Sequence, residues 1–473
     1  MKRWLVVILA VAAWNLVSNT YQSVGAAAQA NHPGDVADGS STCRDAVVGE
    51  PTSGAQAENA ANCPSGSQLA FQDGSVSPDR SARLLYSDLV RGPADAWLTV
   101  WGENIPANAR FTCGDERCEP LSFELDPHHP GTDGFAPRQK LVFRTSGHVG
   151  LVGANSLPYE VVRGRIIEAK PPAIPRASNG DVIYLREGRY ARTVNCGGRR
   201  TVWCGDGQSG VSILGYPGEQ VVIDCSVGQI DLGTRNVKNI TIANLEMDCG
   251  DRGPGFSASR VGSRENLRIV GVYLYDARAP HTGGFGAFSA TVGLYILGNH
   301  TVRTGVPGSN QAHSIYHGGR GLNRDVEIAY NHIENHEGGR AIQIYGHQAG
   351  ESMTGLTIHH NYVHEFSGNA GILVSHTDGQ SGPPNTRCWI SDAVVSDNLI
   401  IDYAGGSGIH IRGCDANGGG GFEVLRNVVV GRAIRVDFSD DSVILEENCL
   451  DRRPEGRYSG DVGRTDYPDC LED

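Results

Sequence analysis

The chain of 473 residues contains very little lysine, with Lys2, Lys140, Lys170 and Lys238 as its only four. All other cationic side chains are arginine, whose planar guanidinium grips a carboxylate through two hydrogen bonds better than an ammonium group does. The net charge is −13 at pH 7. This balance argues against nucleic acid as a partner, because phosphates require a basic surface. A sum over the whole chain still permits a local cationic groove for an acidic substrate.

Long apolar runs are missing outside the N-terminus. Residues 1–30 are typical of a secretory signal peptide, with Lys2 and Arg3 before the apolar run 4–17 and a small-residue cleavage site at 28–30. The run is short for a membrane span and is interrupted by Asn15. We therefore expect a secreted protein, extracellular or periplasmic, which is monomeric and has no membrane association after signal cleavage.

Paired CxxC motifs are also missing, which argues against a zinc site built from thiolates. The cysteines number twelve, and none lies in the signal peptide. An oxidising compartment favours disulfides, and pairing between sequence neighbours is the simplest arrangement, although spacing does not fix connectivity. The neighbour pairs are Cys43/Cys63, Cys113/Cys118, Cys196/Cys204, Cys225/Cys249, Cys388/Cys414 and Cys449/Cys470.

Helical periodicity is missing where the chain repeats itself. Between residues 240 and 450, eight segments such as VEIAYNHI and LTIHHNYV alternate aliphatic residues and then usually place an asparagine before another aliphatic. Repeats of short strands predict an all-β solenoid of stacked coils, and the asparagines predict a buried ladder at an inner turn. The repeated position holds Asn244, Gly271, Asn299, Asn331, Asn361, Asn398, Asn427 and Asn448.

Two segments precede the repeats. Residues 31–80 are rich in Ala, Gly, Ser, Asp and Asn, which predicts a loosely ordered arm. Residues 81–169 contain alternating segments such as AWLTVWGENI, which predict a small β domain. LTVWGENI resembles the opening of the immunoglobulin-like IPT/TIG domains, where a strand ends in a Gly-x-Asn turn. The motif DPHHP at 126–130 has the composition of a metal or catalytic cluster, but we favour a polar loop of this domain.

The entry to the repeats carries a second resemblance. ASNGDVIYLREGRY (177–190) and VSILGYPGEQVVIDC (211–225) are similar to the first coils of secreted right-handed parallel β-helix proteins of the pectate-lyase-like superfamily. With the repeats, this resemblance covers about residues 175–450 and implies a right-handed parallel β-helix over 170–473. Exported members of that superfamily mostly act on acidic polysaccharides.

A second strand in several coils carries the candidate site. Because strand residues alternate between faces, anchoring Ile315, Ile342, Ile372, Ile409 and Ile434 as inward predicts three outward columns. The column one residue after the anchor holds Tyr316, Gln343, Leu373, His410 and Arg435. The column three residues after it holds Gly318, Tyr345, Ser375, Arg412 and Asp437. The column two residues before it holds His313, Arg340, Ala370, Ser407 and Arg432.

The resemblance to the pectate-lyase-like superfamily, rather than the spacing of these columns, implies chemistry on a uronate polymer. β-Elimination needs a cation to neutralise the carboxylate, a base to remove the adjacent proton and an acid to protonate the leaving oxygen. We expect Arg340, with Gln343 or Arg412, to bind the carboxylate, and His313 or Tyr316 to act as base and acid. Further substrate contacts are expected from Tyr345, His347, His376 and His410. The lysine base of several β-helix lyases is excluded within the repeats, since no lysine follows Lys238.

Two alternative functions and one further group of histidines have to be considered. A hydrolase of the polygalacturonase type needs facing carboxylates, for which Glu334, Glu337, Asp378, Asp402 and Asp437 are candidates in different columns. A non-catalytic glycan-binding surface protein would use the same His and Tyr face. A second histidine group is formed by His332, His336, His359, His360 and His364. No three-ligand geometry is evident in it, so we expect no metal and no cofactor, and calcium lacks an acidic cluster.

Overall fold

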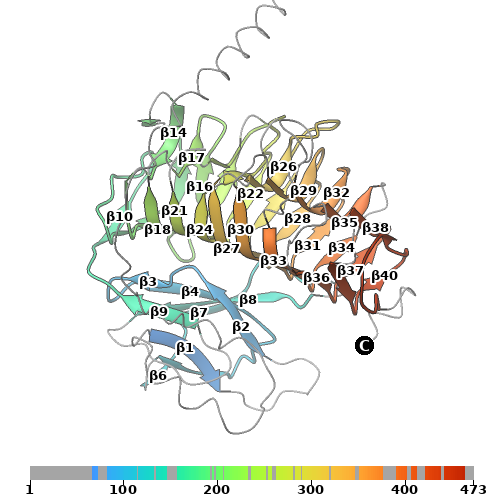
Figure 1. Cartoon of the computed structure of the whole chain (residues 1–473). Coiled ribbons are helices and arrows are strands. Elements are labelled where there is room, and N and C mark those ends of the chain that lie inside the picture. Colours follow the sequence, from blue (N-terminus) through green and yellow to red (C-terminus); the bar gives the residue numbers. More distant parts are fainter. Residues whose placement is uncertain are drawn as a thin grey trace, which may run out of the picture. The chain divides into compact units, whose positions relative to one another are not determined.

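The computed structural model describes most of the chain from residue 67 onward. The described ranges are 67–72, 82–113, 116–132, 135–145, 157–191, 194–196, 199–205, 207–232, 236–251, 254–257, 263–280, 283–288, 290–318, 321–346, 351–376, 390–401, 406–412, 421–437 and 442–463. No described residue is helical, and three long sheets stack their strands coil upon coil (Figure 1). The predicted all-β parallel β-helix is therefore confirmed. The signal peptide and most of the predicted arm lie outside the described residues.

Each complete coil contributes one strand to each of three sheets, which pair in parallel except for β13 with β14. Sheet 1 consists of β10 (Ile166–Ala169), β11 (Val182–Leu185), β15 (Ser212–Gly215), β18 (Val237–Ala243), β21 (Arg264–Val270), β24 (Thr291–Leu297), β27 (Leu322–Ala329), β30 (Ser352–His359), β33 (Ile390–Ser396), β36 (Phe422–Leu425) and β39 (Val443–Glu446). Sheet 2 consists of β12 (Gly188–Tyr190), β16 (Val221–Asp224), β19 (Glu246–Asp248), β22 (Tyr273–Tyr275), β25 (His300–Val302), β28 (His332–Glu334), β31 (Tyr362–His364), β34 (Leu399–Ile401), β37 (Val428–Val430) and β40 (Cys449–Leu450). Sheet 3 consists of β13 (Val194–Cys196), β14 (Arg199–Cys204), β17 (Gln229–Asp231), β20 (Phe256–Ser257), β23 (Phe285–Phe288), β26 (His313–Gly318), β29 (Arg340–Gly346), β32 (Ala370–His376), β35 (Ser407–Arg412), β38 (Ala433–Asp437) and β41 (Glu455–Gly456).

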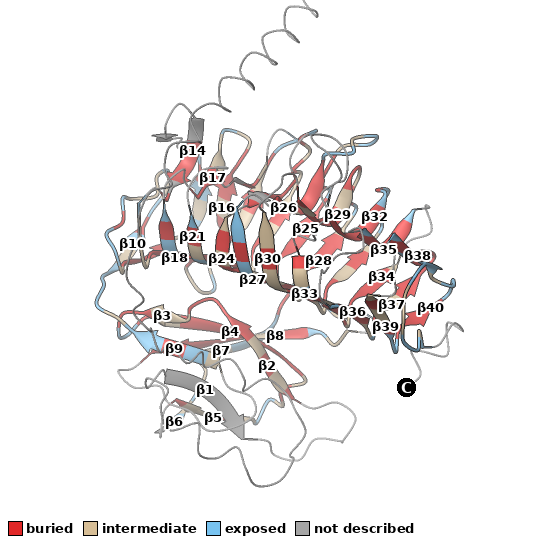
Figure 2. Ribbon diagram, in the orientation of Figure 1, coloured by how far each residue is buried: buried red, intermediate tan, exposed pale blue. Residues whose placement is uncertain are grey.

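Aliphatic side chains from all three sheets fill the interior. Buried stretches occur along the strands of all three sheets (Figure 2). In one coil, Ile328 of sheet 1, Ile333 of sheet 2 and Ile342 of sheet 3 are all fully buried in the same cluster. Branched residues suit these short strands because their stiff side chains pack well on a pleated surface. The repeated aliphatic pattern is thus the core of the solenoid.

The predicted asparagine ladder forms at the turn between sheets 1 and 2. Asn331 Nδ2 donates to Asn361 Oδ1 over 2.9 Å, and the same oxygen accepts from the backbone N–H of Asn331 at 3.1 Å. Equivalent bonds connect neighbouring coils along the whole ladder, which contains Asn299, Asn331, Asn361, Asn398, Asn427 and Asn448. These amides pair backbone groups that would otherwise be buried without partners.

The predicted alignment is wrong by one residue in the first two repeats. Ala243 pairs with Val270, and Val270 with Leu297, so Asn244 and Gly271 occupy the position before the ladder. Consistently, Val272 N–H donates to the Oδ1 of Asn299. Residues at the preceding position share positive φ values, which fit the tight turn. They are Asn244, Gly271, Gly298, Tyr330, His360, Asp397, Arg426 and Glu447, with φ between 50° and 60°.

The small N-terminal domain contains two sheets. Their strands pair antiparallel, except for the short parallel pair of β3 with β9. One has the order β3-β9-β1-β5-β6 and the other β2-β4-β8-β7. Strand β1 lies in the stretch expected to be an arm, and β10 already belongs to the solenoid although the boundary was expected at residue 170. The strands are β1 (Ser67–Gln72), β2 (Arg83–Ser87), β3 (Arg91–Gly92), β4 (Trp97–Glu103), β5 (Arg110–Cys113), β6 (Glu116–Cys118), β7 (Ser122–Leu125), β8 (Arg138–Arg144) and β9 (Leu157–Val161).

Two of the predicted disulfides are present, Cys113–Cys118 and Cys225–Cys249. Each of the other predicted pairs includes at least one cysteine outside the described side chains. Within the described residues, no helix is long and apolar enough to span a membrane.

Candidate functional site

Five neighbouring strands of sheet 3 bring the predicted columns together. Tyr316 of β26 pairs with Gln343 of β29, and the column continues through Leu373, His410 and Arg435. Tyr345 and Arg412 share the adjacent column, separated by Ser375. These two columns therefore have the predicted register.

The third column departs from prediction at its end. A register irregularity in β35 and β38 places Ala433, not Arg432, opposite Ser407. Arg432 is fully buried, and its guanidinium donates to the backbone oxygens of Gly368 and Phe366. Arg432 is therefore an internal bridge between turns and no part of an outward face.

The predicted residues differ in exposure. Arg412 is exposed. Tyr316, Arg340, Tyr345 and His410 are half-buried. His313 and Gln343 are buried, with 3% and 5% of their surface exposed. His376 ends β32 with its backbone opposite Gly346, and His347 lies outside the described residues. The more accessible arginines and tyrosines therefore lie around the buried side chains of His313 and Gln343.

His313 is held in one protonation state. Its Nδ1 accepts a hydrogen bond from the backbone N–H of Arg340 at 3.1 Å, so the ring proton lies on Nε2. Burial, and then the charges of His336 and Arg340, hold the pKa of His313 well below its usual range. The ring centroid lies 5.2 Å from that of Tyr316. Because Nδ1 already accepts a hydrogen bond, the neutral imidazole has no free lone pair for a second proton. It can donate its Nε2 proton more readily than it can accept one.

Arg340 and Arg412 form the cationic part of this face. Arg340 Nη1 donates to the backbone oxygen of Asn310 over 3.1 Å. Burial lowers the pKa of Arg340, the Tyr345 phenol opposes that change, and the nearby charge of Arg412 lowers the pKa further. Neither guanidinium has a carboxylate within ion-pair distance among the described residues.

Some other surface arginines of the solenoid are paired with carboxylates. Arg435 donates to Asp437 and Arg426 to Asp397, at 2.9 Å and 2.8 Å. Arg412 is near enough to lower the pKa of Arg340, and like charges that influence each other without a counterion favour the binding of an anion. The pair Arg340 and Arg412 therefore offers a site for a carboxylate or a related anion.

Two neutral groups complete the face. The Oε1 atom of Gln343 is buried and has no hydrogen-bond partner among the described residues. Such an acceptor is expected to be satisfied by a ligand or by water. His410 Nε2 donates to Asp437 Oδ2 at 2.9 Å, an arrangement that the sequence did not reveal because it spans two coils. Burial lowers the pKa of His410, whereas Asp437 raises it.

The carboxylates proposed for a hydrolase do not face one another. Glu334 lies on β28 of sheet 2, Glu337 pairs with Arg278 beyond that strand, and Asp437 lies on β38 of sheet 3. Asp378 and Asp402 lie outside the described residues. Glu334, Glu337 and Asp437 thus form no facing pair of the kind that this alternative needs.

The second histidine group divides between two surfaces and an interior turn. His332 and His364 lie on sheet 2, where His300 and Glu334 join them. His359 and His360 lie at the end of β30, and His336 is buried against Thr304. Sequence interpretation missed His300 and considered Glu334 only as a hydrolase carboxylate. A signal for the cluster was present: His300 and His332 each follow a ladder asparagine by one residue, and Glu334 and His364 follow one by three.

Comparison with models of known protein families, with characterised proteins and with solved structures yields no match to this chain. Its function therefore has to be argued from the arrangement of its side chains.

Proposed function

We propose that this protein is an exported polysaccharide lyase that cleaves an acidic, uronate-containing polymer by β-elimination on the outer face of sheet 3. The observation that carries the proposal is the pair of unneutralised guanidiniums, Arg340 and Arg412, on strands two coils apart. Strands in a sheet are spaced by about 4.8 Å, so a substrate lying across several coils can contact side chains from each. A repeating anionic chain suits such a surface better than a small molecule does.

Each chemical requirement has a candidate group. Arg340 and Arg412 bind the uronate carboxylate, and neutralising it makes the proton on the neighbouring carbon more acidic. Tyr316 is the base in its phenolate form, because it is accessible whereas His313 is buried with its Nδ1 already bonded. His313, with its proton on Nε2 and its ring beside Tyr316, supplies the positive edge that favours this phenolate.

Sugar contacts surround these groups. The unsatisfied Gln343 Oε1 accepts from a sugar hydroxyl, and Tyr345 offers a ring for stacking. Neutral His410 donates its single ring proton to Asp437, so its other nitrogen can accept from a sugar hydroxyl. The proton that Tyr316 removes passes from its phenol to the leaving glycosidic oxygen, which completes the elimination. His376 and His347 stay predicted substrate contacts, because their side chains lie outside the part of the chain that the structure describes.

The finer assignments of the fold belong to this proposal. The solenoid resembles the pectate-lyase-like superfamily in its entry segments, and the N-terminal domain resembles IPT/TIG modules. In that domain β4 is followed by Asn104 with a φ of 54°, as a Gly-x-Asn turn requires. Such modules are often accessory to carbohydrate-active domains, which is compatible with an exported lyase.

A panel of polymers tests the reaction type. Alginate, pectate and glycosaminoglycans are incubated with the protein while ultraviolet absorbance and reducing ends are recorded together. We expect at least one uronate polymer to yield the ultraviolet-absorbing unsaturated product. Reducing ends without that absorbance would instead establish hydrolysis. Retained affinity without either product would establish a binding protein.

A further inference from the structure

The outer face of sheet 2 carries a histidine cluster that has no part in the proposed lyase reaction. In the register of this sheet His300 pairs with His332, and Glu334 pairs with His364. Alternation places His332 and Glu334 on the same side of β28, since they are two residues apart. Four potential ligands therefore converge from three successive coils.

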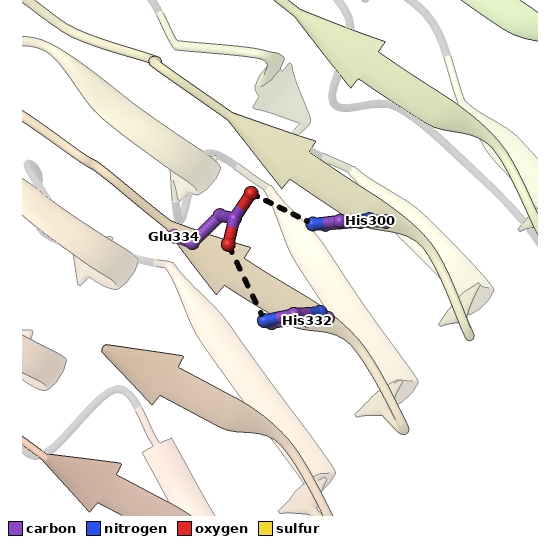
Figure 3. Close-up of side chains that lie close together, drawn as sticks. All are labelled: His300, His332 and Glu334. Atoms are coloured by element: carbon purple, nitrogen blue, oxygen red, sulfur yellow. Dashed lines mark ion pairs between the residues drawn. The ribbon is translucent and has the colours of Figure 1, made fainter. Parts of the chain in front are cut away.

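The distances within the cluster are short. His300 Nε2 lies 3.4 Å from one carboxylate oxygen of Glu334, and His332 Nε2 lies 3.9 Å from the other (Figure 3). His364 Nε2 lies 3.5 Å from Glu334 and 2.8 Å from His332 Nε2. The ligand atoms of His300, His332 and Glu334 all lie within 4.8 Å of one another, and His364 from the next coil contacts two members of this group, His332 and Glu334.

The bonding within the cluster is incomplete without a further atom. Two facing Nε2 atoms share at most one proton, so one of His332 and His364 always contributes only a lone pair. Both ring nitrogens of His300 are buried and lack a hydrogen-bond partner among the described residues. Its contact with Glu334 has ion-pair distance but not hydrogen-bond alignment. An unsatisfied buried imidazole aimed at a carboxylate calls for an explanation.

We propose that His300, His332, Glu334 and His364 bind one divalent transition-metal ion, with zinc as the ion best suited to the ligand set. Three imidazole nitrogens and one carboxylate oxygen match zinc ligation, whereas calcium and magnesium select oxygen ligands. Tetrahedral zinc with bonds of about 2.0–2.1 Å places ligand atoms about 3.3 Å apart. The contacts of Glu334 and the His332–His364 pair, at 2.8 to 3.9 Å, lie on either side of that value. The rings of His300 and His332 stack with centroids 4.2 Å apart, so both must turn their Nε2 atoms toward the bound ion.

The loop 126–130 of the N-terminal domain covers this cluster. The His128 ring stacks on Tyr273 with centroids 4.2 Å apart, and its backbone oxygen lies 3.5 Å from His332 Nδ1. His129 Nε2 bonds the backbone oxygen of Gly298 at 2.9 Å. A carbonyl beside Nδ1 favours the tautomer that leaves Nε2 free for a metal, as in many zinc sites. The loop therefore orients the proposed metal ligand His332. The motif DPHHP is a polar loop, as expected, and it also supports the metal site.

Zinc titration of the untagged protein tests the proposal. We expect one zinc ion per chain by calorimetry. The Co²⁺-substituted protein should show the visible absorption of a four-coordinate site with nitrogen ligands. Outer-sphere changes already weaken metal sites by about 10–100-fold. His332→Gln and Glu334→Gln, which remove ligands, should therefore each weaken binding by more than about 100-fold.

His359→Gln is the matched control. His359 also faces another imidazole, with its Nδ1 2.9 Å from that of His360, and its Nε2 contacts Glu327. The proposal predicts unchanged zinc stoichiometry and affinity in this variant. It is overturned if wild-type protein binds no zinc, or if His359→Gln abolishes binding while His332→Gln does not. Should the ligand variants fold poorly, X-ray absorption of the zinc-loaded wild type decides, because a shell without imidazoles contradicts the assignment.

Discussion

Asn361 is a fully bonded residue of the inner ladder, as are Asn398 and Asn427. Its Oδ1 accepts from the side chain and the backbone of Asn331, and its Nδ2 donates to Asn398 Oδ1 and to the backbone oxygen of Ile328. The residue is fully buried. Removing its amide leaves several buried polar groups without partners, at about 1–3 kcal/mol for each.

We predict that Asn361→Ala lowers the free energy of unfolding by about 3–6 kcal/mol, as two or more such groups are orphaned. Denaturant unfolding followed by circular dichroism measures this. Asn369→Ala is the control, because Asn369 is exposed and its amide bonds only Asn310 among the described side chains. That variant should lose less than about 1 kcal/mol. Equal losses in the two variants would mean that the ladder does not stabilise the fold.

His317 is a buried titratable group inside the solenoid. It pairs with Ile344 in the sheet register, and its Nε2 contacts Thr291 Oγ1 at 2.9 Å. Burial, aided by the charge of Arg264, lowers the pKa of His317 from 6.5 to about 3. His317 lies two residues after the inward-facing Ile315, so strand alternation predicts the inward side chain that the structure shows.

The lowered pKa of His317 makes the fold sensitive to acid. Below pH 6.5 the unfolded chain binds a proton that the folded chain rejects until about pH 3, so stability is present at neutral pH and is lost as the pH falls. The loss is about 1.4 kcal/mol per pH unit within that window. We predict that His317→Gln flattens the pH dependence of the unfolding free energy by about this slope.

Unfolding curves at several pH values between neutral and about pH 4 measure this slope. Thr291→Val, which removes the partner hydroxyl but titrates nothing, should lower stability without changing the slope. A His317→Gln profile parallel to that of the wild type would refute the assignment.

At the scale of elements, the turn between sheets 1 and 2 sets the shape of each coil. One residue with positive φ ends every sheet 1 strand from β18 onward, and a ladder asparagine follows it in six of those coils. Side chains other than glycine pay roughly 1–2 kcal/mol for that conformation. The chain accepts this cost at Tyr330, His360, Arg426 and Glu447, so the turn is over-determined by its neighbours.

We predict that Glu447→Gly leaves stability unchanged or raises it by up to about 1 kcal/mol, because glycine adopts the φ of 54° without strain. Glu446→Gly is the adjacent control. Glu446 is also exposed but belongs to strand β39, where glycine costs roughly 0.5–1 kcal/mol. Differential scanning calorimetry of the two variants should give melting temperatures that shift in opposite directions, or only the control should decrease. A larger decrease for Glu447→Gly would contradict this account.

Element boundaries were only partly predictable. The strand columns of sheet 3 followed from periodicity, because aliphatic alternation survives from coil to coil. The first two ladder positions could not be predicted in this way. Asn244 has the residue type of the ladder but lies in the turn before it, where Lys140 Nζ donates to its side chain at 2.6 Å. The register shift before Ala433 also has no mark in the sequence, because Arg432 and Ala433 both fit the pattern.

At the scale of the whole molecule, the three sheets have different surroundings. The outer face of sheet 1 shares an apolar cluster with the N-terminal domain, to which Leu214, Val270 and Leu297 contribute alongside Trp101 and Phe143. The described part of sheet 2 meets the loop 126–130 at the histidine cluster. These contacts could not be predicted from the sequence, because they join segments more than a hundred residues apart. Sheet 3 carries Arg340 and Arg412, which have no ion-pair partner among the described residues, and is therefore the face that we assign to a polymer.

The most direct test of this account is the rate of unsaturated-product formation on the best polymer of the panel, measured for Arg340→Gln, Arg412→Gln and Arg426→Gln. Arg426 is an exposed arginine neutralised by Asp397 at a turn outside sheet 3, so its variant is the matched control. We predict that each of the first two variants loses about 100-fold or more in kcat/KM, as expected when a group that stabilises developing charge is removed. The control should keep the wild-type rate. Full activity in both Arg340→Gln and Arg412→Gln would contradict the proposed site.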